Sequence, residues 1–155
     1  LTANITDWAA QNLQSGEATL YFENTYVGNS ALNVNQLSDT LTLSLGTDNS
    51  ILVKREKRKD FTSRRVIGAN KTEIYSFLIT IRNNKSIPVE MTLNDQIPVS
   101  SNSAITVAAE ELSGGRLNSQ TGQVKWDLSI RPQETKQIVL TYSVKYPKDK
   151  TVILE

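Results

Sequence analysis

The stretch Val124-Lys125-Trp126-Asp127-Leu128-Ser129-Ile130 decides the fold, because apolar and polar side chains alternate strictly along it. A period of two is typical of a strand with one face in a core and the other in water. We therefore expect Trp126 to be a core anchor and not a ligand platform, since large aromatic side chains dominate core energetics. The pattern predicts a half-buried β-strand.

Similar alternation recurs outward in both directions along the chain. It is found in Thr40–Leu45, in Val89–Leu93 after Pro88, and in Ile138–Tyr146. Turn-forming Asn, Gly, Asp and Pro residues separate these runs every 8–12 residues or so, as in sandwiches and barrels. Asp7–Leu13 is compatible with a short helix, with Thr6 as its N-cap. Ala104–Leu112 can also be read as helical, but we favour a strand at Ile105–Val107, because β-branched residues alternate there with small ones.

These patterns predict an all-β chain. We expect an immunoglobulin-like β-sandwich over residues 70–155, with a hairpin-rich N-terminal half over residues 1–69 and a seam at Gly68–Asn70. The predicted core residues are Leu41, Leu43, Leu45, Phe77, Ile79, Ile81, Val89, Met91, Leu93, Trp126, Leu128, Leu140, Tyr142 and Val144.

Composition excludes several chemistries. The 155 residues contain no cysteine and no histidine, so the chain offers no disulfide, no thiolate and no imidazole base. The net charge of +1 gives no global attraction to nucleic acid. The longest strongly apolar run, within Ile74–Ile81, is far shorter than the roughly 18 residues that cross a bilayer. We expect no cofactor, because the chain has no glycine-rich phosphate loop.

Carboxylates are the remaining catalytic candidates, because a glycoside hydrolase needs only two of them. No spacing singles out a pair, and solvent-facing carboxylates are the ordinary case on strands. Asp48-Asn49 offers oxygen ligands in a turn but lacks the further acidic positions of a calcium loop, so we predict no metal site. The carboxylates considered are Glu90, Asp95, Glu110, Glu111 and Asp127.

A strongly basic segment, Lys54–Arg65, carries a net charge of +5. Cations on both faces of an extended ribbon predict that it leaves the core and projects into water. It would then dock an anionic partner, namely an acidic glycan, a phospholipid headgroup or, least favoured, a nucleic acid. The alternative, which we favour, is an edge strand protected from aggregation by lysines. The candidate patch comprises Lys54, Arg55, Lys57, Arg58, Lys59, Arg64 and Arg65.

Several motifs, in order along nearly the whole chain, resemble the C-terminal domain of the mucoidy inhibitor A family, a domain of unknown function common in Bacteroidetes. The resemblance implies an exported parent protein of the cell envelope and assigns no catalytic residue. It rests on Leu13–Ala18, Tyr26–Ser30, Leu43–Asp48, Val53–Glu56, Arg82–Lys85, Asn94–Ser100, Gly122–Trp126 and Tyr142–Pro147.

Three functions follow from this reading. The favoured one is a non-enzymatic interaction module that holds a partner protein or another part of its own chain. The second is a glycan-binding module, which needs exposed aromatic side chains such as Tyr21, Tyr26 or Trp8. The least favoured is a hydrolase built on carboxylates.

Overall fold

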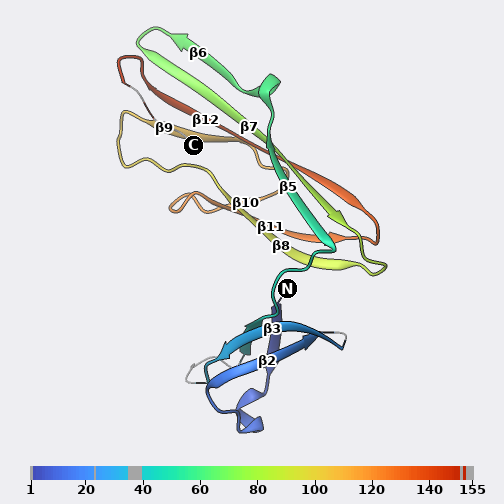
Figure 1. The fold of residues 1–155 in the computed structure, drawn as a ribbon. Helices are drawn as coiled ribbons and strands as arrows, with labels where there is room; N and C mark the ends of the chain where they lie inside the picture. Colours follow the sequence, from blue (N-terminus) through green and yellow to red (C-terminus); the bar gives the residue numbers. More distant parts are fainter. Residues whose placement is uncertain (1, 23, 35–39, 151, 153–155) are drawn as a thin grey trace. The chain divides into compact units, whose positions relative to one another are not determined.

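The computed structural model describes residues 2–22, 24–34, 40–150 and 152 (Figure 1). The chain folds as two compact units, Leu1–Asn49 and Ser50–Glu155. The described residues form antiparallel strands joined by turns, which confirms the predicted all-β class. The described part of the chain contains no helix long and apolar enough to cross a bilayer.

The smaller unit contains two strand pairs. β1 (Thr2–Thr6) pairs with β4 (Thr40–Ser44), and β2 (Gly16–Phe22) pairs with β3 (Thr25–Leu32). Asn24 adopts a φ of 62° in the β2–β3 turn, the left-handed conformation that asparagine tolerates.

The short helix that the sequence allows over Asp7–Leu13 does not form. Only a four-residue 3₁₀ turn, η1 (Trp8–Gln11), forms there, and left-handed Asp7 and Asn12 end it on both sides. Thr6 belongs to β1, opposite Thr40, so it does not cap a helix. Pairing of the β-branched residues before Asp7 takes precedence over a helix too short to hold by itself.

The larger unit is a sandwich of two antiparallel sheets around one core. The first sheet has the order β5-β7-β12-β9, and β6 also pairs with β7. The second sheet has the order β10-β11-β8. The bounds are β5 Ile51–Lys57, β6 Ser63–Ile67, β7 Asn70–Asn83, β8 Val89–Gln96, β9 Thr106–Glu111, β10 Arg116–Leu117, β11 Gln123–Ile130 and β12 Thr135–Pro147.

Alternation positions the core as predicted. Every second residue of β11 is buried, and Trp126 is only 3% exposed. The indole Nε1 of Trp126 donates a hydrogen bond to the Leu112 carbonyl at 2.7 Å, so the one polar group of this buried ring has a partner. The facing core side chains come mainly from β7 and β12.

Most of the predicted core residues are buried, and the exceptions lie at margins. Leu41 and Leu43 are buried in the smaller unit, but Leu45 lies one residue beyond β4 and is half-buried. Val89, Met91 and Leu93 are also half-buried, because β8 is an end strand of its three-stranded sheet. An edge strand has a neighbour on one side only.

Pairing of β5 and β6 with β7 places residues 51–67 in the larger unit, whereas the sequence predicted that they belong with residues 1–69.

The immunoglobulin-like detail of the prediction is not confirmed. With letters assigned in chain order, taking β5 and β6 together as A, the sheets read A-B-G-D and E-F-C. An immunoglobulin constant domain has A-B-E-D and C-F-G instead.

Candidate functional site

The basic segment forms one edge of the larger sheet, which we call the basic edge: β5, the 3₁₀ turn η2 (Lys59–Phe61) and β6 (Figure 1). Within the described residues, β5 and β6 pair with β7 alone. The Arg58 amide also donates to the Ser76 carbonyl at 2.8 Å. The ribbon therefore does not project from the body as predicted, because backbone pairing holds it against β7 on both sides of the turn. Its side chains from Leu52 to Lys57 are nevertheless exposed to water, as expected.

Two of the seven candidate cations lie on the core-facing side of this edge. The Arg55 guanidinium lies 3.6 Å from the centroid of the Phe77 ring, and its Nε is 2.8 Å from the carboxylate of Asp95 on β8. The Lys57 ammonium lies 4.7 Å from the centroid of the Tyr75 ring. These cation–π contacts cover the ends of aromatic core side chains, and Arg55 links one sheet to the other.

The remaining cations of the basic segment, except Arg64, have weak partners or none in the described chain. Lys54 forms an exposed ion pair with Glu56 at 2.8 Å, and Arg58 stacks on the Phe61 ring at 3.6 Å. Within the described chain, Lys59 and Arg65 form no ion pair. An exposed ion pair contributes little, so these cations are available to an anionic partner.

Apolar side chains are exposed on the same edge. Leu52 is 53% exposed, Val53 50%, Phe61 58% and Val66 61%. Leu52 and Val53 are neighbours near the start of β5, whereas Phe61 lies in η2 and Val66 on β6, so the four are spread along the edge. Exposed apolar side chains on an edge strand promote association. The basic edge therefore combines apolar side chains, cations and the backbone of an end strand.

A second polar group, the Glu73 cluster, comprises Arg64, Lys71, Glu73, Tyr75 and Tyr146. The hydroxyls of Tyr75 and Tyr146 each donate to the Glu73 carboxylate at 2.6 Å. Arg64 Nε lies 3.1 Å and Lys71 Nζ 3.3 Å from the same carboxylate, whose side chain is only 16% exposed. The cluster thus joins β6, β7 and β12 through one carboxylate.

Titration in this cluster follows from its geometry. Burial raises the pKa of Glu73, but hydrogen bonds from Tyr146 and Tyr75 and the charge of Arg64 outweigh it, so the pKa lies below its ordinary value. Burial and the Glu73 carboxylate raise the pKa of Tyr75 and Tyr146. The carboxylate stays ionised and the phenols stay protonated near neutral pH.

The Glu73 cluster was not among the predicted sites, although the sequence carries a signal for it. Lys71 and Glu73 lie at every-second positions with the buried Tyr75, Phe77 and Ile79, and therefore on the same face of β7. Charged residues at core-facing positions of a strand are rarely buried unless paired. The spacing of these residues alone therefore predicts a network of paired charges at the start of β7.

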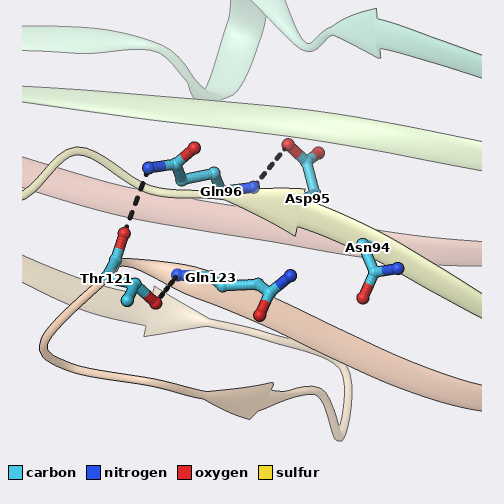
Figure 2. Close-up of a pocket in the computed structure, with 5 residues that line it drawn as sticks. All are labelled: Asn94, Asp95, Gln96, Thr121 and Gln123. Carbon is cyan, nitrogen blue, oxygen red and sulfur yellow. Dashed lines mark hydrogen bonds between the residues drawn. The ribbon is translucent and has the colours of Figure 1, made fainter. Parts of the chain in front are cut away.

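A polar hollow of about 540 Å³ lies beside the last residues of β8 (Figure 2). Gln96 Nε2 donates to the Thr121 carbonyl at 3.1 Å, and the Gln96 amide donates to Asp95 Oδ1 at 2.8 Å. The Gln123 amide donates to Thr121 Oγ1 at 3.3 Å. Amide and carboxylate groups with no aromatic side chain line the hollow, which suits water and small polar molecules. Its lining residues are Asn94, Asp95, Gln96, Thr121 and Gln123.

The structure does not gather the candidate carboxylates into one site. Asp95 is paired with Arg55 as described above, and Glu110 accepts a hydrogen bond from Ser143 Oγ at 2.6 Å on β9. Glu111 accepts from the Ser113 amide at 2.8 Å, and Glu90 is exposed on β8. Among the residues described, no three acidic side chains lie close enough together to hold a metal ion.

Asp127 and Glu90 lie on the exposed face of the three-stranded sheet, as the alternation predicts. They are diagonal neighbours, because Asp127 is opposite Thr92 and Glu90 is opposite Ser129. A hydrogen bond from Thr92, with Lys125 and Arg116 nearby, lowers the pKa of Asp127. A general acid in a glycosidase needs the opposite shift.

Two of the predicted glycan-contact residues lie together on the β2–β3 hairpin. Tyr21 and Tyr26 are 67% and 56% exposed, and their ring centroids are 5.9 Å apart in an edge-on arrangement. The Tyr26 hydroxyl contacts Asn29, whose amide donates to Glu17 at 2.8 Å. Trp8, in η1, is half-buried. The hairpin therefore offers aromatic rings beside polar groups.

Comparison with curated proteins and with solved structures gave no match. A family model described as "Domain of unknown function (DUF4139)" matches residues 3–148. That match covers both units and all strands from β2 to β12, together with all of β1 except Thr2. The chain therefore belongs to the DUF4139 family, a family of domains of unknown function.

Proposed function

We propose that the chain is a non-enzymatic protein-interaction module of an exported cell-envelope protein and that it binds its partner through the basic edge. The observation that carries the proposal is the coincidence of three features on one ribbon. These are an end strand of the larger sheet, four exposed apolar side chains and cations without strong partners.

The main competing explanation is protection of an edge strand by lysines. Lysine and a local excursion of the chain both discourage edge-to-edge association, and the basic edge has both. Protection does not explain why four apolar side chains, Leu52, Val53, Phe61 and Val66, are exposed along the same edge, because exposed apolar side chains on an edge promote association. A surface for a specific partner accounts for both the apolar and the charged residues.

Site-specific photocrosslinking in the full-length protein tests the proposal. A photoreactive residue at Leu52 or Val66 is expected to give polypeptide adducts in the native envelope. Ile87 is the matched control, because it is as exposed as Leu52, at 53%, and lies between β7 and β8 rather than on the basic edge. Equal adduct yields at Leu52 and Ile87, or no adduct at the edge positions, would reject the basic edge as the docking surface.

The resemblance to the mucoidy inhibitor A family supports the envelope location. Fractionation of cells that express the full-length protein from its own gene tests it. We expect the protein in the periplasmic, outer-membrane or secreted fraction. Recovery together with a cytoplasmic marker would contradict the location and leave the docking surface to be judged by crosslinking.

A second candidate function, glycan binding, is favoured by the Tyr21–Tyr26 pair. Aromatic rings beside hydrogen-bonding groups are the usual composition of ligand sites. Wild-type protein is expected to bind a subset of an array of envelope glycans, and Tyr21→Ala is expected to lose that signal. Leu13→Ala is the control, since Leu13 is an exposed apolar residue of the same unit. An empty array, or equal loss in both variants, would exclude this candidate.

A further inference from the structure

The backbone of β5 offers hydrogen bonds that its own sheet does not use. β5 pairs residue by residue with β7 from Ile51, opposite Asn83, to Lys57, opposite Phe77. In an antiparallel pair, alternate residues of an end strand direct their amide and carbonyl groups away from the neighbour. A further extended chain can satisfy these groups by adding to the sheet as a strand.

Side chains of an added strand would alternate between two differently charged rows of β5. Register with the core positions of β7 places Val53, Arg55 and Lys57 on the inner row, because opposite residues share a face. The outer row is Leu52, Lys54 and Glu56. Each row thus contains one exposed apolar residue and at least one cation.

The charge of β5 disfavours a second copy of the same chain. Pairing of two β5 strands would bring lysine and arginine side chains of the copies close together, and like charges side by side destabilise a sheet. An acidic segment meets the same positions with opposite charge. The exposed Lys54–Glu56 pair is weak, so Lys54 can exchange Glu56 for a carboxylate of the partner.

The side chain of Arg55 is held in place before any partner strand binds. Its guanidinium is held by the Phe77 ring and by Asp95, so a neighbouring strand does not have to order a mobile side chain. The turn η2 ends the straight part of the edge after Lys57, which limits the added strand to about the length of β5.

We propose that β5 binds an extended acidic segment of another polypeptide, which adds to the larger sheet as a further strand. This inference rests on the proposed function and specifies the chemistry of its partner. The segment alternates apolar and acidic residues and spans β5.

A labelled peptide of alternating valine and glutamate, as long as β5, is the probe, and fluorescence anisotropy with the full chain is the measurement. We expect saturable binding. Methylation of alternate peptide nitrogens should abolish it, because the charge and the side chains are kept while the strand hydrogen bonds are lost. Lys54→Glu should weaken binding by about three- to tenfold, as expected for reversing one cross-strand charge pair. Lys145→Glu is the matched control, an exposed cation on β12, and should leave binding unchanged.

Each other outcome overturns the inference in a recognisable way. If the methylated peptide binds as tightly as the unmethylated one, or if dextran sulfate displaces the unmethylated peptide, the basic edge is a surface for anionic polymers and does not add a strand. Self-association of the chain that the peptide competes away would make a second copy the occupant. A peptide that does not bind, together with adducts at Leu52, would reject the acidic strand but keep the docking surface. Loss of the adducts would reject the proposed function itself.

Discussion

Replacement of Asn83 by aspartate is expected to destabilise the larger unit by about 4 kcal/mol near neutral pH. Asn83 ends β7 and is fully buried. Its Nδ2 donates to the carbonyls of Ile87 at 2.9 Å, Ile130 at 3.2 Å and Arg131 at 3.1 Å, and its Oδ1 accepts from the Lys85 amide at 2.9 Å. One amide side chain therefore joins the β7–β8 and β11–β12 turns.

The magnitude follows from these contacts. Aspartate keeps the acceptor for Lys85 but loses both donor hydrogens. The Ile130 contact is buried, and an unpaired buried carbonyl costs about 1–3 kcal/mol. The Ile87 and Arg131 contacts are partly buried, so water replaces them at about 0.5–1.5 kcal/mol each. The range is about 2–6 kcal/mol, before the cost of the buried charge.

The same change should make stability depend on pH. Burial and three facing carbonyls should raise the pKa of the introduced carboxyl above its unfolded value of about 3.9. A raised folded pKa means that stability is retained below the unfolded pKa and lost as pH rises through the folded one. The penalty of Asn83→Asp should therefore be smallest in acid and largest at neutral pH.

Urea unfolding of the full chain, followed by circular dichroism at neutral and acidic pH, measures the effect. Asn84→Asp is the matched control. Asn84 is exposed and its Oδ1 accepts a 2.8 Å hydrogen bond from Arg82 Nε, which a carboxylate also accepts. If the two variants unfold at the same urea concentration at neutral pH, the hydrogen bonds of Asn83 are not what holds these turns.

Two further predictions concern the core and the Glu73 cluster. A Cβ at Gly115 would lie 2.5 Å from the Trp126 ring, so Gly115→Ala should cost about 1–3 kcal/mol of unfolding free energy. Gly16→Ala is the control, because nothing lies within 4 Å of the added carbon, and it should leave the stability unchanged. Equal losses of thermal stability in the two variants would refute the packing argument. The pKa of Glu73 is lowered on folding, so its contribution is present above the unfolded pKa and is lost as pH falls through the folded one. Glu73→Gln should therefore flatten the acid side of the stability curve, and parallel curves for variant and wild type would contradict this.

Alternation predicted the fold well where one face is fully covered. Along β11 every apolar residue from Val124 to Ile130 is buried and every residue between them is exposed. The same rule placed Tyr142 and Leu140 in the core. It succeeded because a strand in the middle of a sandwich has one dry face, so the side-chain period is enforced at each position.

Alternation could not predict strand order or edges. An edge strand has a partner on one side, so long charged side chains such as Arg55 and Lys57 can lie over aromatic rings and still reach water. Their charges made β5 resemble a detached ribbon in the sequence. Strand order likewise depends on contacts distant in sequence, and β12 lies between β7 and β9 for reasons that no local pattern records.

The structure also decides which charges of the basic edge are informative to mutate. Seven cations and two carboxylates lie in Lys54–Arg65, and Asp95 and Glu73 reach two of the cations from outside the segment. Alanine at Arg55 would uncover Phe77 and unpair Asp95, so weaker binding to an anionic matrix would report altered packing as well as lost charge. Among the described residues, the side chain of Lys54 forms an ion pair with Glu56 alone, and it is 71% exposed. A change in binding at Lys54 with unchanged thermal stability therefore isolates recognition, whereas a change at Arg55 does not.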